Sequence, residues 1–163
     1  MSAPSTCNAE GGVGKGRFRV MPPTLFVGLL ALTAGIALAA PTRAIDPAPL
    51  NYLGAALVGA GIVLNLWSDQ QLKRAQTTVK PFAQPTVLIT NGAFRLTRNP
   101  MYLGMALILA GTAWLLGSPP ALLCAAAFML AVQRWFVRTE EANAAAVFGA
   151  AYEDYRRSVR RWL

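Results

Sequence analysis

The chain has 163 residues, of which 55% are hydrophobic and only 13% are charged, with a formal net charge of +8. A water-soluble domain carries about 25% charged residues, so this composition argues against a soluble globule and for a protein whose apolar surface faces lipid. There is no histidine and there are only two cysteines, which excludes a disulfide scaffold and the usual zinc sites; we expect no bound metal.

The first 20 residues are polar and glycine-rich and offer almost nothing to bury, which predicts a disordered N-terminal tail. A basic stretch, an apolar run and Ala37-Leu38-Ala39 follow. This arrangement also fits a signal peptide cleaved within residues 1–39. The apolar run is long for a signal peptide and favours a retained helix, but the sequence leaves both readings open.

Four near-continuous apolar stretches come next, each about as long as a helix that crosses the hydrocarbon layer. They cover residues 24–40, 50–68, 101–117 and 121–137. None alternates in the manner of barrel strands, and backbone groups in lipid must be satisfied within the segment, so all four are predicted as α-helices. Residues 21–163 are therefore expected to form one all-α transmembrane domain, with a polar loop at 69–100 and a polar C-terminal segment at 138–163.

The positive charges lie on one side of these predicted spans. Of the 15 Lys and Arg residues, only Arg43 falls in the short connection between the first two spans. The positive-inside rule then predicts that both termini, the long loop and the C-terminal segment are cytoplasmic, and we expect a bacterial inner membrane. Anionic lipid accounts for the net charge, so the bilayer is the expected partner and a nucleic acid is not.

The third span follows a stretch with turn, cation and helix-start signals. Asn91-Gly92 predicts a turn, and Pro100 suits the first turn of a helix whose free amides would attract an anion. Arg95 and Arg98 add positive charge beside this helix start. The stretch predicts a docking site for a carboxylate or phosphate, unless both arginines only anchor the helix at lipid headgroups.

The C-terminal segment combines paired acids with an aromatic face. Spacings of four and three residues place five apolar side chains on one face of a predicted amphipathic helix that lies on the inner leaflet. These are Phe148, Tyr152, Tyr155, Val159 and Trp162. Glu140 and Glu141 precede this face, and two carboxylates near anionic lipid require a positive partner, either an arginine or a cationic ligand.

Three pieces occur in a specific order: the stretch from Arg98 to Gly104 (RNPMYLG), the Glu140-Glu141 pair, and the run from Phe148-Gly149 to Leu163. Together they resemble the isoprenylcysteine carboxyl methyltransferase and phospholipid methyltransferase superfamily, over about residues 50–163. The resemblance implies an integral-membrane enzyme. It would transfer a methyl group from S-adenosylmethionine, leaving S-adenosylhomocysteine, to a lipophilic substrate that enters from the bilayer.

The resemblance also implies the site residues. Carried over to this sequence, the cofactor-binding residues are Arg98, Asn99, Pro100, Tyr102, Gly104, Glu140, Glu141 and Tyr152, with Tyr155 as a weaker candidate. Arg98, Glu140 and Glu141 are also the predicted catalytic residues. Asn99 stands where isoprenylcysteine-type members usually have histidine, a departure that resembles the phosphatidylethanolamine N-methyltransferases. An amide cannot exchange a proton near neutral pH, so histidine-dependent proton transfer is excluded here.

The methyl acceptor stays open at this point. A carboxylate acceptor needs no base, whereas a lipid amine must lose a proton, for which Glu140 or Glu141 is the candidate base. Two alternatives to methyl transfer also remain: a non-enzymatic small membrane protein with a transport or assembly role, and a methyltransferase scaffold that lost its activity through Asn99. The centres of the spans are almost uniformly apolar, which argues against transport.

Overall fold

The protein is a bundle of long helices, as shown by a computed structural model that describes residues 21–39, 50–75 and 86–163. The helices are α1 (Pro22–Ala39), α2 (Leu50–Arg74), α3 (Ala93–Leu96), α4 (Pro100–Leu115), α5 (Leu122–Val132), α6 (Arg138–Phe148) and α7 (Ala150–Ser158). A 3₁₀ turn, η1 (Pro119–Ala121), precedes α5, and a π-helical turn, η2 (Gln133–Val137), joins α5 to α6. No β-strand occurs in the described part of the chain, so the predicted all-α class is confirmed.

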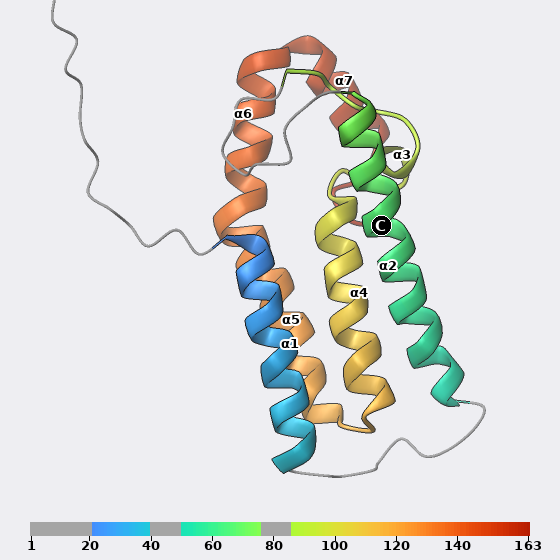
Figure 1. The fold of residues 1–163 in the computed structure, drawn as a ribbon. Helices are drawn as coiled ribbons and strands as arrows, with labels where there is room; N and C mark the ends of the chain where they lie inside the picture. Colours follow the sequence, from blue (N-terminus) through green and yellow to red (C-terminus); the bar gives the residue numbers. More distant parts are fainter. Residues whose placement is uncertain (1–20, 40–49, 76–85) are drawn as a thin grey trace, which may run out of the picture.

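Helix α4 lies at the centre of the bundle. It packs against α2 on one side and against α1 and α5 on the other, and α1 also packs against α5. The four helices alternate in direction (Figure 1), so the start of α1, the end of α2, the start of α4 and the end of α5 lie at the same end. We call this the upper end of the bundle, as drawn in Figure 1. Helices α3, α6 and α7 lie there too.

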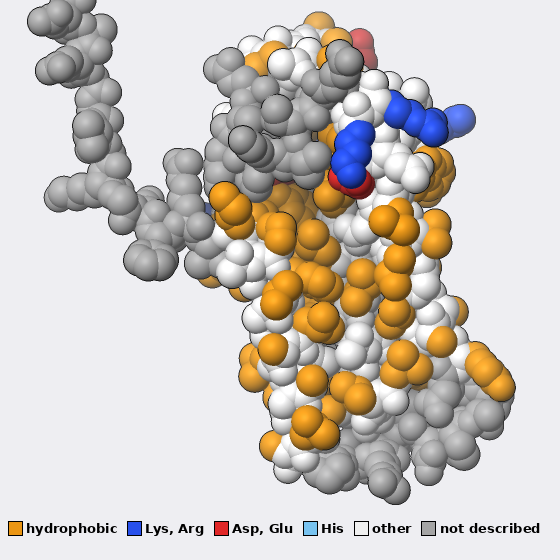
Figure 2. All heavy atoms as spheres, in the orientation of Figure 1, with side chains coloured by type: hydrophobic (Ala, Val, Ile, Leu, Met, Phe, Trp, Pro, Cys, Tyr) orange, Lys and Arg blue, Asp and Glu red, His pale blue; other side chains and the backbone are white. Residues whose placement is uncertain are grey.

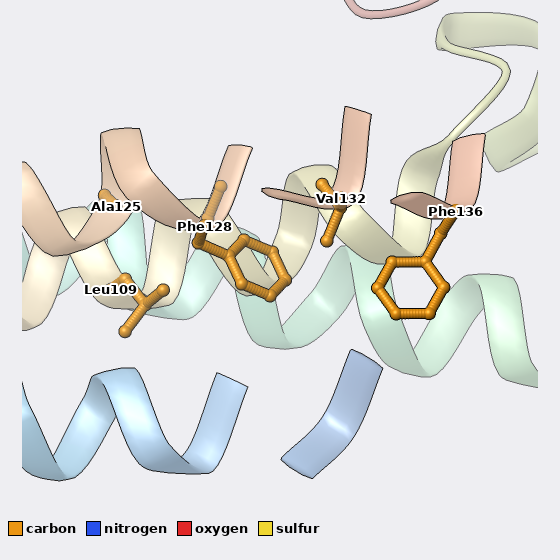
Figure 3. Packing of buried hydrophobic residues seen from close by; sticks show 6 residues of the cluster. Leu109, Ala125, Phe128, Val132 and Phe136 are labelled. Atoms are coloured by element: carbon orange, nitrogen blue, oxygen red, sulfur yellow. The ribbon is translucent and has the colours of Figure 1, made fainter. Parts of the chain in front are cut away.

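The hydrophobic core lies between α1, α4 and α5. Leu109 of α4 and Phe128 and Val132 of α5 are fully buried, and Figure 3 shows them in a row with Ala125 and Phe136. Phe26 of α1 meets Phe128 edge to face, with ring centroids 6.2 Å apart. This packing fixes α5, and with it the helix that continues to α6, relative to α4.

Helices α2 and α4 approach so closely that their contact depends on glycine. A Cβ atom built on Gly61 would lie 2.5 Å from the Gly104 carbonyl oxygen, and one on Gly111 would lie 2.7 Å from the Gly54 carbonyl oxygen. Such distances leave no room for a side chain, so the two backbones are in direct van der Waals contact. Since α2 and α4 are antiparallel, the two glycine pairs lie two helical turns apart along one seam.

Three helical stretches are long and apolar enough to cross a membrane: Pro22–Ala39, Tyr52–Arg74 and Pro119–Phe148. Large apolar side chains point outward from them, including Leu38, Val63 and Leu130. Figure 2 shows hydrophobic side chains along the bundle on one face and charged side chains only near its upper end. An apolar exterior of this kind fits contact with lipid.

Helix α4 differs from the predicted third span. It has 16 residues and is apolar, but it is shorter than the other three stretches. At about 1.5 Å per residue, it is also shorter than the roughly 30 Å hydrocarbon layer. A complete crossing by α4 therefore stays a prediction, and with it the fourth span.

The second predicted span and the loop after it were bounded incorrectly. Helix α2 does not stop at Ser68 but continues to Arg74, supported by an ion pair between Lys73 and Asp69, 2.6 Å apart. Within the predicted loop the chain also forms α3. Helix propensity and charge pairs one turn apart extend a helix beyond its apolar part, so hydropathy alone ends it too early.

The predicted continuous C-terminal helix is also wrong. The helix breaks at Gly149, whose φ of +52° is the left-handed conformation that glycine adopts without strain. Phe148 belongs to α6, whereas Val159 and Trp162 lie beyond the end of α7. The aromatic side chains of α7 face protein: Tyr152 and Tyr155 form a buried cluster with Val159, packed against Leu88, Ala144, Ala145 and Phe148. Contact of this segment with the inner leaflet stays a prediction.

Two of the sequence predictions concern residues outside the described ranges. The N-terminal tail falls on residues 1–20, and the connection that carries Arg43 falls on residues 40–49.

Candidate active site

The segment before α4 has an extended backbone and leads into a helix whose first residue is a proline. Thr97 has the extended backbone angles φ −154° and ψ 150°, and Pro100 occupies the first turn of α4. The residue before a proline avoids the helical region, and proline itself is preorganised for a helix start. The sequence therefore holds Arg98 and Asn99 at the upper end of the bundle, just before the free amides of α4.

An ion triad connects this segment to α6 and to the C-terminus. Arg98 Nη1 lies 3.0 Å from Glu141 Oε1. Arg161 binds the same carboxylate through two nitrogen atoms of its guanidinium group: Nε donates to Oε1 at 3.0 Å, and Nη2 donates to Oε2. The side chains of Arg98 and Glu141 are only 10% and 14% exposed. Together, the Glu141 carboxylate and the two guanidinium groups carry a net charge of +1.

Tyr152 completes the surroundings of Arg98. The Arg98 Nη1 group donates to the Tyr152 hydroxyl over 3.5 Å, a long hydrogen bond. Burial raises the pKa of Tyr152, and the Glu141 carboxylate raises it further, so the phenol stays neutral at physiological pH. The Arg98 Nε group is buried and has no hydrogen-bond partner among the residues that the structure describes. A buried donor of this kind remains available to an anionic ligand.

Glu140 has a different environment from its neighbour. Its Oε1 accepts a hydrogen bond of 2.8 Å from the Tyr102 hydroxyl of α4, and the Tyr102 ring lies 6.4 Å from that of Phe136. None of the arginines or lysines in the described ranges forms an ion pair with Glu140. The two adjacent carboxylates thus have different partners: Glu141 is bound by two arginines, while Glu140 accepts a hydrogen bond from a tyrosine of α4.

Asn99 and Gly104 have structural contacts of their own. The Asn99 Nδ2 group donates to the Arg161 carbonyl at 3.1 Å. Gly104 faces α2, where an added Cβ would meet the Asn65 side chain and lie 2.8 Å from the Gly61 carbonyl oxygen. Asn65 itself donates back to Gly61 within α2, at 2.9 Å. The glycine of the RNPMYLG stretch is therefore explained by helix packing, and its contact with a cofactor stays a prediction.

Tyr155 lies at the site and is hydrogen-bonded to α3. Its hydroxyl donates to the Phe94 carbonyl of α3 at 2.6 Å, and burial raises its pKa to about 12. We expect Tyr155→Phe to lower the free energy of unfolding by about 1 kcal/mol, the usual cost of a lost hydrogen bond. Thermal unfolding in detergent would measure this loss. Tyr52→Phe is the control, because Tyr52 is 71% exposed, and an equal loss in both variants would contradict the assignment.

The predicted site residues fall into two groups. The structure brings Arg98, Glu141 and Tyr152 together, and it pairs Tyr102 with Glu140. The others, Asn99, Pro100, Gly104 and Tyr155, support the surrounding backbone.

Four further residues contribute to this site and were not predicted as site residues. Thr97 donates to the Arg161 carbonyl at 2.9 Å, and Trp162 Nε1 donates to Gln133 Oε1 of the π-helical turn at 3.1 Å. The fourth is Arg161 itself. It lies within the C-terminal run that carries the family resemblance, where it is one of four arginines that spacing cannot rank.

Comparison with known proteins identifies the family of the chain. Residues 50–151 match the family model described as phospholipid methyltransferase. The chain is 36% identical over 76 residues to a Schizosaccharomyces pombe protein named protein-S-isoprenylcysteine O-methyltransferase, an alignment that covers 45% of this chain and 31% of that protein. The chain thus matches about a third of the length of this curated relative. No solved structure matches. The family model covers more than half of the sequence, including Arg98, Glu140 and Glu141, and the chain belongs to the phospholipid methyltransferase family.

Proposed function

We propose that this protein transfers a methyl group from S-adenosylmethionine to a lipophilic acceptor at the upper end of the bundle. The observation that carries the proposal is the ion pair between Arg98 and Glu141, 43 positions apart in sequence and 3.0 Å apart in space. Two segments that carry the family's sequence features thereby meet in one partly buried place. Family membership supports methyl transfer as the reaction.

The residues present fit the proposed methyl donor. S-adenosylmethionine supplies an activated methyl group on a sulfonium and also carries an amino acid carboxylate. The buried, unpartnered Nε group of Arg98 is a donor suited to that carboxylate. Glu140, which lacks an arginine partner within the described ranges, supplies negative charge suited to a cation. The site thus offers each end of the donor molecule a group of opposite charge.

The structure also suggests which residue would take up a proton from the methyl acceptor. Tyr102 holds the Glu140 carboxylate in one orientation through a 2.8 Å hydrogen bond. With an amine acceptor, Glu140 would take up the proton that the amine must lose. Glu141 is less accessible for this role because both of its carboxylate oxygens are already bound by arginines. With a carboxylate acceptor no base is required. The proposal therefore assigns base chemistry to Glu140 alone.

We also propose that the upper end of the bundle faces the cytoplasm. The Lys and Arg residues of the described ranges cluster in the segments that meet there, which is the distribution that the positive-inside rule describes for a cytoplasmic face. An acceptor dissolved in the bilayer would reach the site from the side, across the apolar exterior of the helices. Its lipophilic part would remain in lipid while its polar end contacts Glu140 and Arg98.

Binding of S-adenosylmethionine to the purified full-length chain in detergent tests the proposal. We expect the wild type to bind, and Arg98→Met to weaken binding about 30-fold, the loss expected for a charge-assisted hydrogen bond. Because Glu141 keeps Arg161 as a partner, this variant should still fold. Arg157→Met is the control, since Arg157 is 79% exposed.

Transfer of label from S-adenosylmethionine to extracted membrane lipids would then identify the acceptor. A wild type that folds but binds no S-adenosylmethionine would contradict the proposal and favour a non-enzymatic role. Binding without transfer to any lipid would point to a scaffold that has lost its activity.

A further inference from the structure

Arg161 contacts both parts of the candidate site: Glu141 of α6 and the segment around Arg98. Its guanidinium binds both oxygens of Glu141 on α6. Its carbonyl oxygen accepts hydrogen bonds from Thr97 Oγ1 at 2.9 Å and from Asn99 Nδ2 at 3.1 Å, on either side of Arg98. The Arg161 side chain thus binds the Glu141 carboxylate, while the Arg161 main chain binds the segment that carries Arg98.

The triad leaves Arg98 only partly engaged. Glu141 shares its Oε1 between Arg98 Nη1 and Arg161 Nε, while its Oε2 is bound by Arg161. A carboxylate and a guanidinium alone in a buried site favour a parallel, two-bond pairing. With Arg161 bound to the second oxygen, the Arg98 Nη1 group approaches the first. In this arrangement the Arg98 Nε group has no hydrogen-bond partner among the described residues.

The segment that carries Arg161 is held in place without its side chain. The Arg98 amide donates to the Arg160 carbonyl at 3.0 Å, and Trp162 Nε1 donates to Gln133 at 3.1 Å. The hydrogen bonds that the Thr97 and Asn99 side chains donate are accepted by the main-chain carbonyl of Arg161, so they too do not involve its side chain. Loss of the Arg161 guanidinium should therefore change the charges at Glu141 and leave the course of the backbone intact.

We propose that Arg161 is a positioning residue: by binding Glu141 through both oxygens, it keeps the Nε group of Arg98 free for an anionic group of the methyl donor. This inference rests on the proposed function. It concerns the side chain of Arg161, which acts through Glu141 and Arg98.

Titration calorimetry with S-adenosylmethionine and S-adenosylhomocysteine on the full-length chain in detergent tests the assignment. We expect Arg161→Met to raise both Kd values about tenfold, the change expected for loss of one charge-assisted interaction, with an unchanged unfolding midpoint. Arg161→Lys keeps the charge but not the two-bond geometry, so its Kd should fall between those of Arg161→Met and the wild type. Arg157→Met removes an exposed arginine from the preceding helix and should bind like the wild type.

A double-variant cycle separates positioning from a merely structural role. If Arg161 acts through Glu141, then Glu141→Gln combined with Arg161→Met should bind no more weakly than Glu141→Gln alone. Additive losses would overturn the inference, as would wild-type affinity in Arg161→Met. If Arg161→Met does not fold, a folded Arg161→Lys with wild-type affinity would overturn it equally. Failure of the wild type to bind either compound would instead overturn the proposed function.

Discussion

Replacing Glu141 by alanine is expected to lower the free energy of unfolding by about 3 kcal/mol and to abolish binding of the methyl donor. The Arg98 side chain is only 10% exposed, and its one carboxylate partner within the described residues is Glu141. Removing one member of a buried ion pair leaves an uncompensated charge, which costs more than the pair itself contributes. Here the cost is increased because Arg98 and Arg161 would then face each other without an intervening carboxylate. Chemical unfolding in detergent, followed by circular dichroism, measures the loss.

Glu140→Gln is the matched control, one residue away on the same helix. A glutamine oxygen can still accept the hydrogen bond from Tyr102, and no arginine in the described ranges loses a partner. We expect the free energy of unfolding to change by less than about 1 kcal/mol. If the proposed base role is correct, methylation of an amine acceptor should nevertheless fall sharply. Equal destabilisation by Glu141→Ala and Glu140→Gln would contradict the different environments described for the two carboxylates.

The difference between Glu140 and Glu141 shows what a motif can and cannot predict. The pair as such was predicted from the sequence, and so was its need for a positive partner. Successive residues on a helix point about 100° apart, so adjacent glutamates cannot share one environment. Which of them meets Arg98 depends on how α6 is rotated relative to α4. The π-helical turn at Gln133–Val137 contributes to that rotation, and no pattern in the sequence predicts it.

The helices themselves were predicted better than their ends. Long apolar stretches located all four long helical segments because the bilayer requires them, but hydropathy does not register helical residues that lie beyond the apolar part. Gln71 is an example: it lies in the polar last turns of α2, and its Oε1 accepts a hydrogen bond of 2.9 Å from the Ala93 amide of α3. The polar end of α2 thereby holds the segment that leads to Arg98.

The C-terminal periodicity illustrates the opposite error. Five side chains from Phe148 to Trp162 follow a helical spacing, yet the chain leaves the helix at Gly149 and again after Ser158. The same spacing also suits a chain that folds back and buries these side chains against protein. Only the return of the chain toward α4 brings Arg161 to Glu141. Contacts between distant residues of this kind depend on the tertiary fold and cannot be read from local patterns.

Adding a single methyl group at Gly61 is expected to disturb both the fold and the site. In Gly61→Ala the new Cβ would lie 2.5 Å from the Gly104 carbonyl oxygen and 2.8 Å from Ile108 Cγ1. A backbone oxygen cannot rotate away, so α2 and α4 must separate, at an expected cost of about 2 kcal/mol or more. Because Gly104 is one turn from the start of α4, the shift should also displace Arg98 and weaken binding of S-adenosylmethionine.

Gly59→Ala supplies the control on the same helix, two residues earlier. A Cβ at Gly59 would meet nothing within 4 Å, so this variant adds the same atom and the same helix propensity without the clash. Alanine is favoured over glycine inside a helix by up to about 1 kcal/mol, so Gly59→Ala should be as stable as the wild type or more stable. Unfolding in detergent and titration with S-adenosylmethionine would be compared for both variants. If Gly61→Ala matched Gly59→Ala in both measurements, α2 and α4 would not be in backbone contact, and the seam would not determine the position of Arg98.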